Sequence, residues 1–111
     1  MSAPGVPAVD IAQLPPDAAM VDVRETDEWT AGRAPTATHV PMSELPGRLP
    51  EVPTDVDPLY VICRSGSRSG RVVAYLTAHG YRAVNVAGGM QAWQAAGREM
   101  VCDGPAPPQV V

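Results

Sequence analysis

The stretch LYVICRSGSRS, residues 59–69, joins a short apolar run to a cysteine and then to a turn rich in glycine and serine. The apolar run is typical of a buried strand. Apolar positions at helical spacing follow from residue 69 to residue 76 and predict an amphipathic helix that ends near Gly80. We therefore expect a strand, a tight loop and a helix N-terminus in succession, with Cys63 at the junction.

Cys63 is the candidate nucleophile of this stretch. The backbone N–H groups of such a loop converge on one point, where the helix dipole adds about half a positive charge. An ordinary cysteine thiol titrates near about 8.5, and a helix N-terminus with neighbouring arginines lowers this pKa by roughly one to several units. We predict that Cys63 lies at the mouth of an anion-binding loop and reacts at neutral pH. The alternative is a buried structural cysteine at a strand end.

Short apolar runs alternate with helix-compatible segments along the rest of the chain. Further strands are predicted at residues 20–23, 38–40 and 83–86, and helices begin near residues 26, 43 and 90. Such alternation is typical of an α/β fold with a mostly parallel sheet. Ligands of open α/β sheets bind beyond the carboxyl ends of the strands, which is where Cys63 lies.

Length and composition predict one domain. The chain has 111 residues, of which 45% are hydrophobic, and can bury a single core. We place this domain at residues 1–102 and expect residues 103–111, with three prolines, to be disordered. Residues 1–20 hold four prolines and no basic residue, so we expect neither a secretory signal nor a membrane anchor.

The two cysteines lie 39 positions apart, and neither has a second cysteine close by. This spacing is typical of neither a disulfide framework nor a zinc site. We expect no metal, and cytoplasmic localisation in a reducing environment. Cys102 falls just beyond the expected core; it is either incidental or a second thiol that receives sulfur or forms an adventitious disulfide.

Charge is distributed unevenly along the chain, whose net charge is −4. Residues 1–57 contain ten acids and three arginines, whereas residues 58–98 contain five arginines and no acid. A basic segment around Cys63 favours a small bound anion, and the acidic total argues against nucleic acid. Every cation is arginine, whose planar fork suits oxyanions, although a compositional preference for arginine over lysine explains this equally well.

Several motifs together resemble the single-domain rhodanese (thiosulfate sulfurtransferase) family from about residue 9 to residue 97. The resemblance implies a three-layer α/β fold with a five-stranded, mostly parallel sheet flanked by helices. The motifs are MVDVR at residues 20–24 with Glu28, Val40-Pro41, CRSGSRS at residues 63–69, Gly80-Tyr81, and GGM at residues 88–90 with Trp93.

The resemblance also implies the chemistry. Cys63 would take sulfane sulfur from thiosulfate or a related donor as a persulfide and pass it to cyanide or a thiol in a ping-pong reaction without a cofactor. A sulfur-relay protein is a further candidate partner. The substrate-binding residues implied are Arg64, Ser65, Gly66, Ser67, Arg68 and Ser69, with the two arginines on the sulfonate end of the donor. Asp22 and Arg24 are either supporting site residues or scaffold. As scaffold, the Asp22 side chain would bond backbone groups at the strand end, and Arg24 would form an ion pair with Glu28.

Two other functions remain as alternatives. Similar cysteine-dependent phosphatases and arsenate reductases need a wider loop, with arginine at the position that Ser69 occupies here. A rhodanese-like module can also act only by binding partners, as a non-enzymatic regulatory domain. The chain departs from the family pattern at residues 33, 34 and 36, where Thr36 replaces a glycine, which leaves the local turn geometry open.

Overall fold

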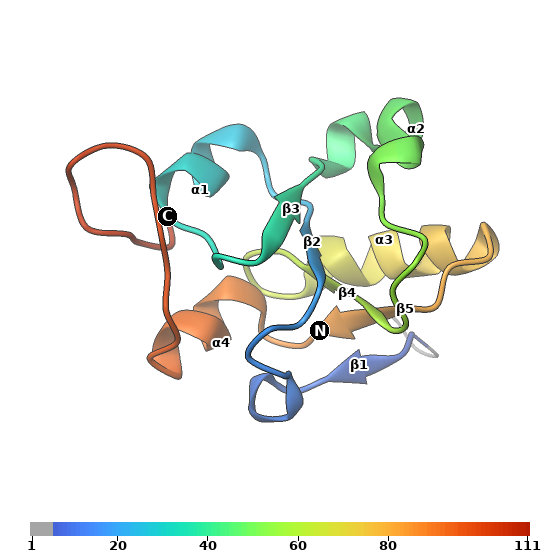
Figure 1. The fold of residues 1–111 in the computed structure, drawn as a ribbon, viewed down its shortest axis with the longest axis horizontal. Helices are drawn as coiled ribbons and strands as arrows, with labels where there is room; N and C mark the ends of the chain where they lie inside the picture. Colours follow the sequence, from blue (N-terminus) through green and yellow to red (C-terminus); the bar gives the residue numbers. More distant parts are fainter. Residues whose placement is uncertain (1–5) are drawn as a thin grey trace.

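The computed structural model describes residues 6–111. Residues 1–5, which belong to the predicted domain 1–102 and to the N-terminal stretch 1–20, lie outside the described residues. The described residues form one sheet of five parallel strands in the order β1-β5-β4-β2-β3 (Figure 1). The predicted α/β fold is confirmed. The strands are β1 (Ala8–Val9), β2 (Met20–Asp22), β3 (Ala37–His39), β4 (Leu59–Ile62) and β5 (Ala83–Val86).

Helices cover both faces of the sheet. The α-helices are α1 (Thr26–Ala31), α2 (Leu45–Arg48), α3 (Ser67–Ala78) and α4 (Gly89–Ala95). Three short 3₁₀ helices, η1 (Ile11–Gln13), η2 (Met42–Glu44) and η3 (Leu49–Glu51), lie in the connections. Because all strands are parallel, their carboxyl ends meet at one edge, where the loop after β4 begins with Cys63.

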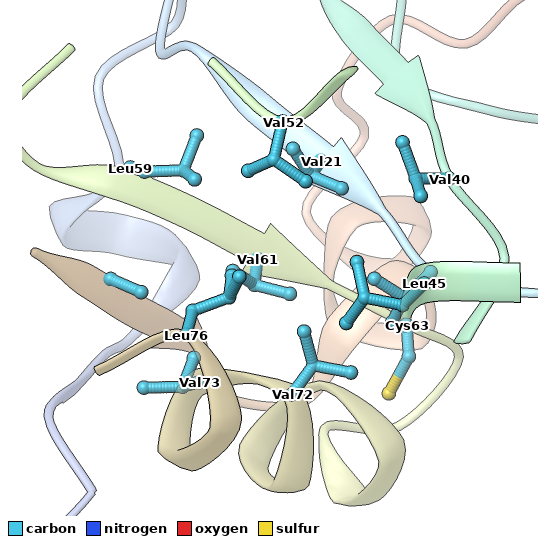
Figure 2. Packing of buried hydrophobic residues seen from close by; sticks show 12 residues of the cluster. Val21, Val40, Leu45, Val52, Leu59, Val61, Cys63, Val72, Val73 and Leu76 are labelled. Atoms are coloured by element: carbon cyan, nitrogen blue, oxygen red, sulfur yellow. The ribbon is translucent and has the colours of Figure 1, made fainter. Parts of the chain in front are cut away.

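Strand residues alternate between two apolar clusters. Val61 and Cys63 point to the face covered by α2 and α3, where Val72, Val73 and Leu76 of α3 pack against them (Figure 2). On the opposite face the buried residues include Met20, Ile62, Val86, Met90 and Trp93, which bring α4 onto the sheet. Side chains on a strand alternate with a period of two, so this register decides which residues share a face with Cys63.

The proline-rich segment before β4, residues 49–58, contributes to the core. It contains η3, and Val52 behind that helix is 2% exposed and belongs to the apolar cluster under α3. Proline-rich sequence hid this contact, because proline is tolerated in the first turn of a short helix. Among residues 6–111, no helix combines the length and the apolar character needed to cross a membrane.

The C-terminal segment, expected to be disordered, lies along α1 in the structure (Figure 1, red). The backbone N–H of Asp103 donates to Thr30 O at 3.0 Å, and that of Gln109 donates to Ala31 O at 3.0 Å. Both acceptors belong to the last turn of α1, whose carbonyls have no partner within the helix. Composition alone could not reveal that these carbonyls offer the segment fixed hydrogen bonds.

The unusual residues 33 and 36 have local roles. Arg33 donates to Trp29 O at 3.1 Å and pairs with Asp103 at 2.9 Å, so it joins α1 to the C-terminal segment. Thr36 Oγ1 donates to Ala18 O at 3.1 Å. Among residues 6–111 only glycines have positive φ, so Thr36 adopts no left-handed conformation and the turn tolerates it.

Candidate active site

Cys63 directly follows β4 and lies beneath the first turn of α3. The backbone N–H of Gly66 donates to Cys63 Sγ at 3.0 Å, and Ser69 Oγ donates to the same sulfur at 3.2 Å. Figure 2 shows the Cys63 side chain on the α3 side of β4, near Leu45 and Val72. The sulfur therefore faces a backbone donor and a hydroxyl donor at the start of a helix.

Gly66 makes this geometry possible. It is the residue before α3, and its φ is +105°, a conformation that L-residues with a Cβ rarely adopt. Its carbonyl accepts the backbone N–H of Gly70 at 3.1 Å and so begins the helix, while its own N–H turns toward the sulfur. A glycine at this position is thus required by the turn that folds the loop around Cys63.

The environment of Cys63 acts on its acidity in two directions. Burial raises the pKa of the thiol, whereas hydrogen bonds from the Ser69 side chain and from the backbone N–H groups of Ser69, Gly66 and Ser65 lower it. The pKa of Cys63 is lowered overall. Hydrogen bonds to the charged form therefore outweigh desolvation, as a thiolate nucleophile requires.

The accessibility of Cys63 differs from its prediction. The residue is 1% exposed, although the sequence predicts a thiol at the open mouth of the loop. The reason is that the helix after the loop packs its apolar face, including Val72, over the same side of β4. Arg64, Ser65 and Ser67 form the exposed surface above the sulfur, whereas Gly66 and Ser69 are buried with it.

Arg68 is held by an ion pair. Its Nη1 and Nη2 atoms donate to the two carboxylate oxygens of Glu28, each at 2.8 Å. Glu28 lies on α1, so the pair links α1 to α3 across the mouth of the loop. This hydrogen bonding lowers the pKa of Glu28 and raises that of Arg68. The guanidinium fork predicted to hold a sulfonate is occupied by a protein carboxylate.

Arg64 has a different environment. Its side chain is exposed, and among the contacts of residues 6–111 its guanidinium makes one hydrogen bond, from Nε to Val111 O at 2.9 Å. The C-terminal segment therefore reaches the loop that follows Cys63.

Asp22 and Arg24 form a buried pair at the carboxyl end of β2. Both side chains are 0% exposed, and Arg24 Nη2 donates to Asp22 Oδ2 at 2.7 Å. The same Nη2 donates to Gly32 O at 2.7 Å, and Nη1 donates to Glu28 O at 3.3 Å. The sequence suggested an ion pair of Arg24 with the Glu28 carboxylate; that carboxylate binds Arg68 instead. Arg24 contacts carbonyls at the end of α1, and Asp22 binds Arg24, which fits the scaffold alternative.

Asn85 is a buried polar residue at the site that sequence analysis missed. Its Nδ2 donates to Gly66 O at 3.1 Å, and Ser69 Oγ donates to its Oδ1 at 2.5 Å. The available signal was an amide in the otherwise apolar strand AVNV, residues 83–86. Because the strand ends near the carboxyl edge of the sheet, a polar side chain there indicates contact with the loop after β4.

The turn between β5 and α4 supports the loop from behind. The backbone N–H of Met90 donates to Cys63 O at 2.8 Å, and that of Gln91 donates to Arg64 O at 3.0 Å. A Cβ at Gly89 would lie 2.4 Å from Cys63 O and 2.7 Å from the carbonyl carbon of Arg64. Gly89 thus allows a close contact between two backbones.

The basic segment predicted around Cys63 is dispersed in the fold. Arg82 lies 3.7 Å from Asp57, which precedes β4 at the opposite edge of the sheet. Arg98 donates from Nη2 to Ile11 O and Leu14 O, each at 2.7 Å, on the other face. Sequence proximity therefore overstated the positive charge at the loop.

A cavity of about 390 Å³ lies at the amino end of β4, lined by residues that include Leu59, His79 and Tyr81. It is at the opposite end of the strand from Cys63. Cys102 also lies away from the loop, in the C-terminal segment, where its Sγ donates to Ala106 O at 3.0 Å. Neither feature contributes a group to the sulfur.

Comparison with known proteins agrees with this architecture. The family model described as "Rhodanese-like domain" matches residues 9–96. The protein named "Sulfurtransferase" of Allochromatium vinosum is 41% identical over 86 residues, which cover 77% of this chain and 79% of the relative. "Putative sulfurtransferase YtwF" of Bacillus subtilis is 41% identical over 75 residues, which cover 68% of this chain and 72% of the relative.

Two further matches bear on fold and partners. The crystal structure of a rhodanese-related protein from Thermoplasma volcanium has a TM-score of 0.81 and 30% identity, and the match covers 87% of this chain and 99% of that one. A Bacillus subtilis protein named "Putative sulfur carrier protein YrkF" is 35% identical over 75 residues, which cover 67% of this chain and 40% of that protein.

Proposed function

The chain belongs to the rhodanese-like domain family, and from this premise we propose that it transfers sulfane sulfur through a persulfide on Cys63. Relatives named sulfurtransferases support sulfur transfer as the general activity. The observation that carries the proposal is the pair of donors on Cys63 Sγ, the Gly66 N–H at 3.0 Å and the Ser69 hydroxyl at 3.2 Å. These donors favour a negatively charged sulfur.

The proposed reaction has two transfers. The Cys63 thiolate attacks the outer sulfur of thiosulfate; a bond forms between Sγ and that sulfur, and the S–S bond of thiosulfate breaks. The electron pair leaves with sulfite, and Cys63 becomes a persulfide anion. Cyanide or a thiolate then attacks the outer sulfur, departs as thiocyanate or a persulfide, and returns Cys63 to the thiolate.

Loop residues have separate roles in this proposal. Backbone N–H groups of Ser65, Gly66 and Ser69 stabilise the sulfur charge, because hydrogen bonds to an anion are stronger than those between neutral groups. Arg64 is exposed and carries the positive charge that attracts an anionic donor. Ser65 and Ser67 line the exposed approach to the sulfur.

Access to the sulfur is part of the proposal. Cys63 is 1% exposed in the structure, so a donor reaches it only when the Cys63 side chain rotates or the short loop opens. The loop residues Arg64, Ser65 and Ser67 are exposed and can move without disturbing the core. Small donors such as thiosulfate need a smaller opening than bulky ones do.

The acceptor and the compartment are further parts of the proposal. A persulfide can pass to a thiol on another protein, and similarity to the protein named a sulfur carrier supports a sulfur-relay partner. A reducing compartment such as the cytoplasm suits an enzyme whose resting state is a free thiol.

The second candidate is a rhodanese-like module that only binds a partner. The burial of Cys63 favours it, because a thiol that stays covered transfers nothing. Intact-mass measurement after incubation with thiosulfate distinguishes the two functions. We expect the wild-type protein to gain one sulfur atom and cyanide to remove it, while Cys63→Ala gains nothing. If thiosulfate leaves the mass of wild type unchanged, as it does that of Cys63→Ala, the binding module is favoured.

A further inference from the structure

Asn85 is a polar side chain in the middle of an apolar environment. It lies on β5 and is 0% exposed. Its strand neighbours Val84 and Val86 point to the opposite face of the sheet, since side chains alternate along a strand. Asn85 therefore faces α3 and the loop after β4, on the same side of the sheet as Cys63.

The two amide atoms of Asn85 contact both arms of the loop. Nδ2 donates to Gly66 O at 3.1 Å, before the first turn of α3, and Oδ1 accepts from Ser69 Oγ at 2.5 Å, within that turn. Gly66 and Ser69 are also the residues that donate to Cys63 Sγ, at 3.0 and 3.2 Å. One buried side chain thus holds both residues that contact the sulfur.

The proton inventory explains why the position of Ser69 Oγ matters. A serine hydroxyl has one proton, and Ser69 Oγ lies within reach of two acceptors, Asn85 Oδ1 and Cys63 Sγ. When Cys63 is a neutral thiol, its S–H can donate to Oγ while the hydroxyl proton goes to Asn85. When the sulfur is charged, the hydroxyl proton turns toward it and leaves Asn85 Oδ1, so in this form Asn85 holds the loop through Nδ2 on Gly66 O.

We propose that Asn85 is a positioning residue that holds the Gly66 N–H against Cys63 sulfur in both its neutral and charged forms and places the Ser69 hydroxyl within reach of that sulfur. It acts through these two residues and does not touch the substrate. For the thiolate the proposal stands on geometry alone, and its extension to the persulfide rests on the proposed function. Loss of Asn85 would leave a fold with a less acidic thiol.

A substitution at Asn85 changes no charged group near the loop. Arg68 of α3 is the cation whose charge interacts with that of Cys63, and Glu28 of α1 neutralises it in the ion pair at 2.8 Å. On the neighbouring strand β2, Asp22 and Arg24 neutralise each other in a buried pair. A change at Asn85 adds or removes no charge, so a shift in thiol acidity reports hydrogen bonding.

The test measures the pH dependence of iodoacetamide alkylation at Cys63, with Cys102→Ser in every protein so that one thiol reacts. We expect the midpoint for Asn85→Ala to lie about one pH unit above that of the parent, so that alkylation well below the midpoint is about tenfold slower. Asn85→Val should give the same shift and suits a strand. Val84→Ala, on the opposite face of β5, is the matched control and should leave the midpoint unchanged.

The same Asn85 substitution in the Ser69→Ala protein tests whether Asn85 acts through Ser69 and Gly66. Ser69→Ala removes the hydroxyl arm and leaves the Gly66 arm, so Asn85→Ala should cause a smaller but measurable shift in Ser69→Ala than in the parent. A midpoint unchanged in both Asn85 variants, with only lower thermal stability, would overturn the proposal. Alkylation needs no sulfur donor, so this result is independent of whether the protein accepts sulfur from thiosulfate.

Discussion

Two arginines of one loop differ in what they can contribute, and only their contacts reveal it. In sequence, Arg64 and Arg68 are equivalent candidates for the sulfonate end of a donor. In the structure, both Nη atoms of Arg68 bind the Glu28 carboxylate, whereas Arg64 is exposed and donates from Nε to Val111 O. Residue type and spacing single out both arginines, but they cannot tell which guanidinium is already bound.

The first prediction separates these roles by donor charge. Arg64→Ala should raise the KM for thiosulfate about fivefold to tenfold, because an exposed charge contributes modestly to binding an anion. Transfer from a neutral sulfur donor should change little. Arg68→Ala should lower the activity with both donors equally and should lower the free energy of unfolding. A selective loss of thiosulfate use in Arg68→Ala would instead return the sulfonate role to Arg68.

The second prediction concerns Glu28. Its hydrogen bonds with Arg68 lower its pKa in the folded protein, so the pair stabilises the fold above the unfolded pKa of about 4.3. This stability is lost as the pH falls through the lowered folded pKa. Glu28→Gln should reduce the free energy of unfolding by about 1–2 kcal/mol at pH 7. Urea unfolding at pH 7 and at pH 3 measures the difference.

The free energy of unfolding of wild type should exceed that of Glu28→Gln by less at pH 3 than at pH 7. The reason is that pH 3 lies below the unfolded pKa of about 4.3, where the contribution of the ion pair declines. Glu51→Gln is a control on an exposed pair with Arg48, and it should change stability less at either pH. An equal difference between wild type and Glu28→Gln at both pH values would show that the ion pair is not its source.

At the scale of elements, the loop that begins with Cys63 depends on the turn from β5 to α4. The backbones approach closely, with Met90 N–H on Cys63 O at 2.8 Å. Gly89 has a φ of +55°, and a Cβ there would meet the backbone of Cys63 and Arg64. The loop and the turn therefore form one packed unit at the carboxyl edge of the sheet.

The third prediction uses two glycines with positive φ. Gly89→Ala should lower the free energy of unfolding by about 2–4 kcal/mol, from backbone strain and from a clash with rigid neighbours. Gly97→Ala is the matched control, with a φ of +72° and no atom within 4 Å of an added Cβ. It should cost only about 1–2 kcal/mol. Chemical unfolding gives both values, and equal costs would contradict the close contact at Gly89.

Much of the element order could be predicted from the sequence. The strand at residues 83–86 matches β5 as predicted, and that at residues 20–23 lies within one residue of β2. By contrast, β1 was not predicted from the residues, because its two residues, Ala8–Val9, are too short to show periodicity. The fifth strand was expected only from the family resemblance.

The site could be predicted only in part, because local motifs are visible in the sequence and long-range contacts are not. The CRSGSRS motif contains the local donors to the sulfur, Gly66 and Ser69, and both contact Cys63 Sγ. Asn85 lies on another strand and reaches the loop through the parallel register, in which it is the partner of Val61. Long-range contacts of this kind, and the burial of Cys63 under α3, depend on packing that no local pattern records.

At the scale of the molecule, the C-terminal segment connects α1 to the loop that begins with Cys63. It donates to the last carbonyls of α1 through Asp103 and Gln109, packs Val110 against the apolar cluster around α4, and reaches Arg64 through Val111 O. Each of these contacts lies within residues 6–111 and crosses a long stretch of sequence. The segment therefore adds to the fold although its composition is typical of disorder.

The last prediction tests this docking with Gly32, the residue after α1. A Cβ at Gly32 would lie 2.4 Å from Gln109 O and 2.8 Å from Gln109 N, although its φ of 175° is extended and suits any residue. Gly32→Ala should therefore destabilise the full chain by displacing the segment, by about 1–3 kcal/mol. In a chain ending at residue 102 the same substitution should cost much less, because the clashing backbone is absent. Urea unfolding of the four proteins measures this coupling. Additive costs would mean that the segment does not rest on Gly32 in solution, whereas non-additive costs would establish that the end of the chain is held beside the loop that carries Cys63.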